Sequence, residues 1–175
     1  MPEFNPLTVR DRRAETADSV SIAFDVPAEL RTAYRFAPGQ FLTLRARVDG
    51  EELRRSYSIC VPASRYERAG ELRVAVRRVP GGRFSNWLND ALQPGQRLDV
   101  MTPDGRFSVP LRPEQARHHV GFAGGSGITP MMSLIGTLLE AEPDSSFTLV
   151  YGNRGAATIM FIEPVSYTHL TLPTN

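Results

Sequence analysis

The hydrophobic pattern of this chain changes near residues 113–117, and that change limits which folds are available to it. Before it, apolar and polar side chains alternate with period two, which places the apolar ones on one face of a sheet and the polar ones in water. The clearest runs are residues 20–26, 42–48 and 72–76. Pro-Gly and Asp-Gly pairs separate these runs. We therefore predict an antiparallel barrel or sandwich over residues 1–113, with one short helix at 85–92 that has Ser85 as its N-cap.

The residues after this change have the pattern of a β-α-β unit. A short apolar run, His119–Ala123, leads directly into Gly124–Gly127, and a helix is expected next with Thr129 as its N-cap. A second strand of the buried type follows at Phe147–Tyr151. Two strands joined through a helix must be parallel, so we predict part of an α/β domain with a parallel sheet over residues 114–163.

The final residues, 164–175, do not continue either pattern. They contain no charged residue, and they match the translation of a common sequencing-library adapter. We expect this segment to be an assembly scar, and the natural gene to continue beyond about Ile162.

Composition excludes several classes of protein. All 20 cationic side chains are Arg, so Schiff-base chemistry on Lys and the Lys of a P-loop are both excluded. The single cysteine, Cys60, allows no intrachain disulfide and no thiolate cluster, and we expect it to be a small buried residue. His118, His119 and His169 lack the spacing of metal ligands, so no metal site is expected.

Charge and hydropathy suggest where the protein works. A net charge of +1 gives no electrostatic footprint for nucleic acid or for an anionic membrane, and neither is expected as a partner. No apolar run approaches the ~18–20 residues that span a bilayer, and the first residues do not resemble a signal peptide. We therefore expect a cytoplasmic protein.

Gly124–Gly127 is the most informative segment. Glycines let the backbone approach a pyrophosphate, and the helix that follows offers free N–H donors. Two standard motifs are narrowly missed: Pro130 replaces the third Gly of G-x-G-x-x-G, and Ile128 replaces the second Gly of a hydrolase nucleophile elbow at Ser126. A plain strand-to-helix turn is the alternative. Arg154, after the next strand, favours a 2′-phosphate and hence NADPH over NADH, unless it is simply a solvated surface residue.

The first region carries a second candidate site. Arg54–Ser58 combines guanidinium groups for phosphate, an aromatic ring that can stack, and hydroxyls that can bind a heterocycle edge. An arginine-rich edge strand would look similar. Within Arg77–Asn86, glycines stand directly before a helix N-terminus, which makes another phosphate-ready segment. Two anion sites in two different folds suggest two nucleotides bound near each other.

Four motifs, in this order, resemble the ferredoxin–NADP reductase superfamily. They are Pro38–Phe41, Arg55–Ser58, Gly81–Asn86 and Gly125–Pro130, and the resemblance extends from Phe4 to about Phe161. It implies an FAD-binding antiparallel β-barrel of the ferredoxin-reductase type, followed by a partial α/β NAD(P)-binding domain with a parallel sheet.

The resemblance also implies roles for particular residues. The FAD-binding residues that it implies are Arg55, Tyr57, Ser58, Val76, Arg77, Arg78, Gly82, Arg83 and Ser85. Among them, Arg55 would bind the pyrophosphate, Tyr57 would pack on the isoalloxazine, and Ser58 would be the catalytic residue near flavin N5. The NADP-binding residues that it implies are Gly125, Ser126, Gly127, Thr129 and Arg154.

The activity implied is electron transfer from NADPH through FAD to an iron–sulfur centre. The likeness is greatest to reductases that serve a multicomponent oxygenase acting on phenylacetyl-CoA. A [2Fe–2S] cluster is expected only in a C-terminal part that this sequence lacks, because four cysteines are needed and only Cys60 is present. The alternatives are an α/β-hydrolase-like esterase that uses Ser126 and a non-catalytic nucleotide-binding domain.

Overall fold

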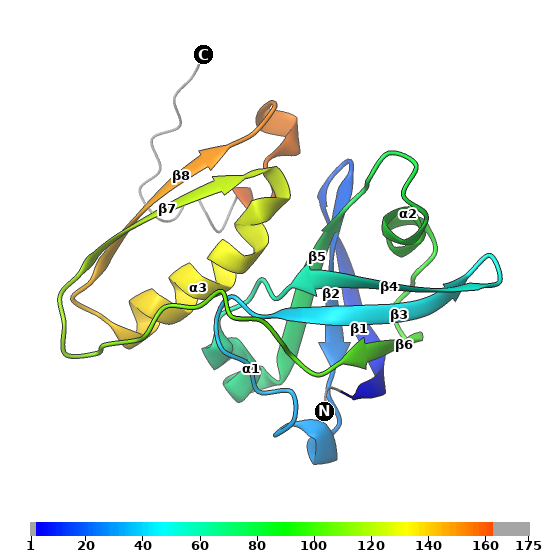
Figure 1. Ribbon diagram of the computed structural model, residues 1–175, viewed down its shortest axis with the longest axis horizontal. Coiled ribbons are helices and arrows are strands. Elements are labelled where there is room, and N and C mark those ends of the chain that lie inside the picture. Colours follow the sequence, from blue (N-terminus) through cyan, green and yellow to red (C-terminus); the bar gives the residue numbers. More distant parts are fainter. Residues whose placement is uncertain (1–2, 163–175) are drawn as a thin grey trace.

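A computed structural model describes residues 3–162 (Figure 1); the expected scar at 164–175 and His169 lie outside them. The strands are β1 (Phe4–Thr16), β2 (Ser19–Asp25), β3 (Phe41–Val48), β4 (Glu51–Ser58), β5 (Glu71–Arg77), β6 (Arg97–Met101), β7 (His118–Gly124) and β8 (Ser146–Gly152). The helices are α1 (Ala63–Ala69), α2 (Arg83–Asp90) and α3 (Ile128–Ala141), with 3-10 turns at Ala28–Leu30, Gly125–Gly127 and Ala156–Thr158.

The first six strands form one antiparallel sheet in the order β4-β3-β6-β1-β2-β5. Its two ends meet, because Ile59 pairs with Val74 and the Cys60 N–H donates to the Arg73 carbonyl at 3.0 Å. The predicted barrel is confirmed. The inward side chains form one buried core, in which the Tyr34 hydroxyl donates to the Val100 carbonyl at 2.6 Å.

The outer face of β2 and β5 is buried as well, and the expectation of polar side chains in water is wrong there. Arg73 is buried and pairs with Glu71 at 2.8 Å and with Asp11 at 2.7 Å, and it donates to Ser21 Oγ at 3.0 Å. Burial of a charge is tolerated when it is paired and hydrogen-bonded in this way. Alternation in sequence therefore predicted the strands but not what covers them.

Helix α2 begins earlier than the sequence predicted. Gly82 occupies the N-cap position and offers no side chain, while Ser85 lies inside the first turn. The Val79 N–H donates to Ser85 Oγ at 3.1 Å, so Ser85 fixes the turn that leads into the helix rather than capping it. Phe84 and Leu88 anchor the helix in the barrel core.

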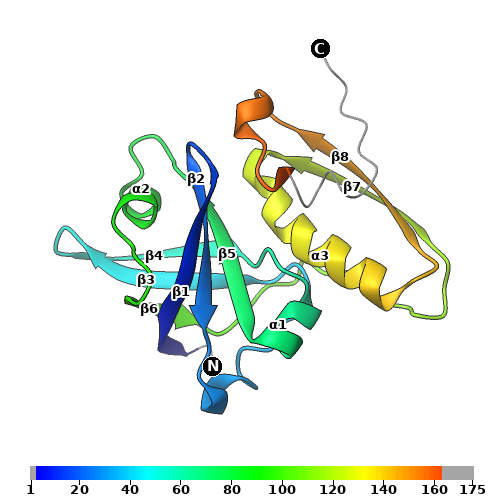
Figure 2. The same ribbon diagram turned by 180° about the vertical axis from the view of Figure 1, so that it is seen from behind.

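Strands β7 and β8 pair in parallel and α3 packs on one face of them, as predicted for a β-α-β unit (Figure 2). We call residues 118–162 the second unit. Helix α3 starts at Ile128 directly after the Gly125–Gly127 turn, so Thr129 is not its N-cap. Instead, Thr129 Oγ donates back to the Ser126 carbonyl at 2.9 Å and tightens the turn.

The other face of the β7–β8 pair is open, so the prediction of buried-type strands is wrong within the described residues. The exposed fractions are 76% for Phe122, 57% for Val120 and 50% for Val150. Helix α3 covers the opposite face, where its Met131 side chain is buried and lies against Gly121 of β7.

The barrel and the second unit are packed together through small residues. Cys60 and Ala75 of the barrel share a buried cluster with Ile128 and Met131. A Cβ built on Gly136 of α3 would lie 2.6 Å from Pro62 Cγ, so only glycine fits this close approach. No helix among residues 3–162 has the length and apolar character needed to cross a membrane.

Candidate functional site

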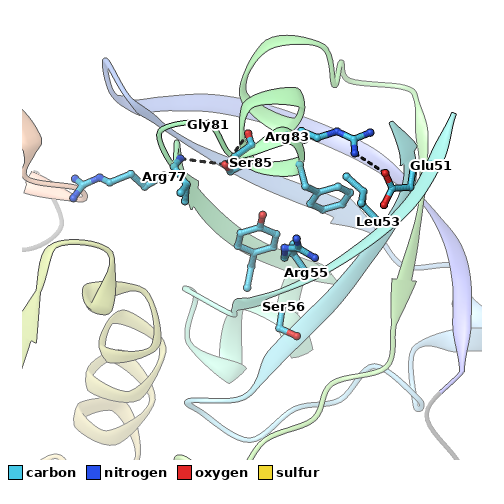
Figure 3. Close-up of a pocket in the computed structure, with 12 residues that line it drawn as sticks. Glu51, Leu53, Arg55, Ser56, Arg77, Gly81, Arg83 and Ser85 are labelled. Atoms are coloured by element: carbon cyan, nitrogen blue, oxygen red, sulfur yellow. Dashed lines mark hydrogen bonds and ion pairs between the residues drawn. The ribbon is translucent and has the colours of Figure 1, made fainter. Parts of the chain in front are cut away.

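A cavity of about 490 Å³ opens beside the barrel between β4, the end of β5 and α2 (Figure 3). Its size falls within the roughly 300–1,000 Å³ that is common for small-molecule sites. Its lining residues are Glu51, Leu53, Arg55, Ser56, Tyr57, Arg77, Val79, Gly81, Gly82, Arg83, Phe84 and Ser85. Six of the nine residues predicted to bind FAD are therefore brought together here.

Strand β4 contributes a cation and an aromatic ring. Arg55 is exposed, donates only to the Arg54 carbonyl at 2.7 Å, and makes no ion pair with any described residue. Tyr57 stacks on Phe84, with ring centroids 6.4 Å apart and planes 12° apart. Burial raises the pKa of Tyr57 to about 12, so its ring is neutral at physiological pH. The strand thus offers an available guanidinium beside a flat apolar surface.

The N-terminus of α2 forms the opposite wall. A Cβ on Gly82 would lie 2.8 Å from Ser85 Oγ and 2.9 Å from Val79 Cβ, so the tight turn requires glycine. No side chain in the described part of the chain caps the helix, which leaves its first backbone N–H groups available to an anion.

Three predicted residues have other partners in this structure. Arg83 pairs with Glu51 at 2.5 Å and donates to the Val48 carbonyl at 3.0 Å, at the outer end of the cavity (Figure 3). Arg78 pairs with Asp90 and does not line the cavity. Arg77 lines the cavity, but its guanidinium donates to the Thr158 carbonyl of the second unit.

Two further predicted residues lie outside the cavity lining. The Val76 side chain is buried in the barrel core, so only its backbone could face a ligand, and its carbonyl accepts from Asn89 Nδ2 at 3.3 Å. Ser58 is half-buried at the end of β4, next to Tyr57. The role assigned to Ser58 stays a prediction.

A second candidate site lies at the carboxyl ends of β7 and β8. Gly124 and Gly152 are in register there, and the Tyr151 hydroxyl donates to the Gly125 carbonyl at 3.0 Å. Gly125 has a φ of 50°, a left-handed value that favours glycine. Among the described residues no side chain caps the next helix, and its first N–H, that of Ile128, donates to the carbonyls of Gly125 and Ser126. Ligands of α/β sheets bind at this end of the strands.

The predicted NADP-binding residues gather at this same end. Gly125, Ser126 and Gly127 form the turn, Thr129 braces it, and Arg154 is exposed just after β8. None of them lines the cavity beside the barrel, so the two candidate sites are separate but adjacent.

Within residues 3–162, serine hydrolase geometry is absent around Ser126. His118 and His119 begin β7, whereas Ser126 follows its end, and a strand rise of about 3.3 Å per residue puts them on the order of 20 Å apart. His118 contacts Ser146 and Thr148 instead. Among residues 3–162 there is thus no histidine to act as a general base for Ser126.

The described residues hold no cluster of His, Cys, Asp and Glu that could bind a metal ion. Cys60 is buried, and burial raises the pKa of its thiol, so it is a packing residue rather than a reactive one, as expected from the sequence.

The cavity chemistry fits a dinucleotide that carries a flat ring. Arg55 and the uncapped N-terminus of α2 suit a pyrophosphate, and the face of Tyr57 suits a planar heterocycle. Phe84 and Val79, which also line the cavity, were not predicted. The helix predicted at 85–92 began after Phe84, so nothing in the sequence indicated that this ring reaches a ligand site.

Comparison with known proteins agrees with this geometry. Residues 6–109 match the family described as "Oxidoreductase FAD-binding domain", and residues 122–172 match "Oxidoreductase NAD-binding domain". The second match runs past Ile162 across residues outside the described part of the chain, so the scar expected there stays a prediction.

Two curated relatives are components of oxygenase systems. One component of the 1,2-phenylacetyl-CoA epoxidase from Escherichia coli (strain K12) is 48% identical over 161 residues, which is 92% of this chain and 44% of that protein. The ferredoxin reductase component of 3-ketosteroid-9-alpha-monooxygenase from Rhodococcus rhodochrous is 40% identical over 159 residues, which is 90% of this chain and 43% of that protein. The chain thus spans less than half the length of these relatives.

Among solved structures, phthalate dioxygenase reductase has a similar fold, with a TM-score of 0.73 and 27% identity. The match covers 93% of this chain and 48% of that one. Its structure is described as modular, for electron transfer from pyridine nucleotides to [2Fe–2S].

Proposed function

The chain belongs to the oxidoreductase FAD-binding domain family, within the ferredoxin–NADP reductase superfamily, and on that premise we propose that it is the flavin- and nucleotide-binding part of a reductase that takes electrons from NADPH. One observation carries the proposal. A cavity with an available arginine, a stacking ring and a free helix N-terminus lies next to a glycine turn at the carboxyl ends of two parallel strands.

Each residue has a physical task in this proposal. The Arg55 guanidinium and the first N–H groups of α2 hold the pyrophosphate of FAD, and Tyr57 packs on its ring system. Ser58, next in β4, would offer a hydroxyl near flavin N5. When bound, FAD supplies the conversion of a two-electron donor into one-electron steps.

The second unit would hold the other nucleotide. The N–H groups of the Gly125–Gly127 turn bind its pyrophosphate, and Arg154 binds the 2′-phosphate that distinguishes NADPH from NADH. The packing of the two units fixes the distance between the two ligands, which is the main contribution of a protein to such a transfer.

The acceptor is inferred from the relatives. One is named as part of an epoxidase and the other as part of a monooxygenase, so we propose that the electrons pass to an iron–sulfur centre and then to the oxygenase component of a multicomponent system of the phenylacetyl-CoA epoxidase type. The four cysteines of a [2Fe–2S] site are not in this sequence and would have to come from another part of the protein. A cytoplasmic location, where a single thiol stays reduced, is part of the same proposal.

The test is a spectrum of the full chain. After incubation with FAD and removal of the excess, the protein should be yellow. NADPH added without oxygen then measures, as loss of the flavin absorbance, how fast this part of the reductase transfers hydride. A colourless protein that takes up no FAD would contradict the proposal. Labelling of Ser126 by a serine-directed phosphonate would instead support the esterase alternative, which the positions of His118 and His119 disfavour.

A further inference from the structure

Arg77 lies between the two candidate sites. It is the last residue of β5 and belongs to the cavity lining, yet its side chain extends away from the other labelled residues and toward the segment after β8 (Figure 3). It is 21% exposed, so it is mostly enclosed by the barrel and the second unit.

Three segments surround its guanidinium. Nη2 donates to the Thr158 carbonyl, and Nε lies 3.5 Å from Asp18 Oδ1, an ion pair without a hydrogen bond. Nη1 faces Gly125: a Cβ built on that glycine would lie 3.0 Å from it. The planar guanidinium of Arg, with its several N–H donors, can contact three segments at once, whereas the ammonium group of Lys is a single compact charge.

Gly125 is held from a second side by Tyr151, whose hydroxyl donates to the Gly125 carbonyl at 3.0 Å. Arg77 and Tyr151 therefore enclose a turn that, with three glycines in Gly124–Gly127, would otherwise lose much conformational entropy on binding a ligand. Ordering such a turn in advance raises affinity, because less entropy is lost on association.

We infer that Arg77 is a positioning residue that orders the glycine turn and fastens it to the barrel, rather than a ligand of the flavin. The inference rests on the proposed function and changes the role that the sequence motif suggests for this residue. It follows that loss of Arg77 weakens binding of the nicotinamide nucleotide while FAD stays in place.

The experiment uses the full chain loaded with FAD and titrated with NADP⁺, followed by the change in flavin absorbance. Arg77→Met should raise the dissociation constant for NADP⁺ about tenfold, as loss of a charged hydrogen bond does, and change that for FAD less than about twofold. When the flavin of the saturated complex is then reduced with dithionite, the variant should also show less long-wavelength charge-transfer absorbance between reduced flavin and NADP⁺, because a loosened turn no longer orients the nicotinamide. Arg77→Lys, which can still donate to Thr158, should recover part of the affinity for NADP⁺ and part of the long-wavelength absorbance.

The matched control is Arg10→Met. Arg10 also joins a carboxylate, Asp25 at 2.5 Å, to a backbone carbonyl, that of Ala69 at 3.3 Å, but away from both sites. This variant should bind NADP⁺ and FAD as the unchanged chain does. Equal affinity for NADP⁺ in Arg77→Met and the unchanged chain would overturn the inference, as would a loss of FAD in Arg77→Met. Failure of the unchanged chain to bind FAD would overturn the proposed function itself.

Discussion

The barrel and the second unit differ in how completely they bury their sheets. The barrel closes on itself, and its β2 and β5 strands are buried on both faces. The second unit covers one face of two strands with α3 and leaves the other face open within the described residues. The cavity is therefore lined by barrel residues alone, whereas the glycine turn is contacted by residues of both units, Arg77 and Tyr151.

The largest expected effect compares one residue type in the two regions. Phe84→Ala should lower the free energy of unfolding by about 3–5 kcal/mol, because Phe84 is 2% exposed and lines the cavity. Phe122→Ala should change it by less than about 0.5 kcal/mol, because Phe122 lies on the open face. Urea unfolding measures both. Equal losses would mean that the second unit is as closed as the barrel.

The next effect tests the barrel site by itself. Arg55→Ala should weaken FAD binding about ten- to a hundredfold, since a charged hydrogen bond is lost, without changing the urea midpoint. The control is Arg54→Ala on the opposite face of β4, where the guanidinium pairs with Glu52 at 2.7 Å. Fluorescence titration with FAD gives both affinities. Unchanged FAD binding in Arg55→Ala would remove this residue from the site.

A smaller effect tests the dependence of the second unit on the barrel. Gly136→Leu should destabilise the protein by about 1–3 kcal/mol through overpacking against Pro62, and weaken NADP⁺ binding more than FAD binding. Gly155→Leu, where a Cβ meets nothing within 4 Å, is the control. If Gly136→Leu weakened the binding of NADP⁺ and of FAD equally, the contact at Pro62 would not act on the second unit in particular.

The smallest effect depends on pH. Glu142, buried after α3, accepts from the Arg117 side chain, from the Arg112 N–H at 2.8 Å and from Ser145 Oγ at 2.8 Å, and His119 Nε2 lies 3.4 Å away. The hydrogen bond from Arg117 holds the pKa of Glu142 well below its ordinary value of 4.5. This carboxylate fastens the segment between the barrel and β7.

The pH dependence of this stability follows from which state of the chain binds a proton first. In acid the unfolded chain protonates Glu142 first, so the stability contributed by the carboxylate is complete above its ordinary pKa of 4.5 and is lost as the pH falls toward the lower pKa of the folded state. Glu142→Gln should therefore be less stable than the unchanged chain near neutral pH, and the gap should narrow in acid. Glu140→Gln, at an exposed position of α3, is the control in the same urea series. If the difference in stability between Glu142→Gln and the unchanged chain did not vary with pH, the negative charge of Glu142 would not be the source of its stabilising effect.

Local pattern predicted the elements but not their surroundings. Alternation located the strands, and the Gly124–Gly127 segment located the turn before α3. The local pattern could not show that Arg73 is buried, because its partner Asp11 is distant in the sequence. It also misassigned Ser85 and Thr129 as N-caps, since the chain already turns at Gly82 and Gly125–Gly127 and both hydroxyl side chains brace those turns from inside.

The candidate site shows the same limit. The motifs assigned Arg55, Tyr57 and Gly82 to one ligand, and the three residues do line one cavity; their roles toward FAD stay a prediction. The direction of the Arg77 side chain depends on the second unit, through Gly125 and Thr158, and no local pattern encodes it.

A crystal structure of the full chain grown with FAD tests the central claim most directly. We predict a pyrophosphate at the first turn of α2 within reach of Arg55, and the tricyclic ring against Tyr57 on the side facing the second unit. Saturating FAD with no density in that cavity, or a flavin bound elsewhere on the molecule, would contradict this claim.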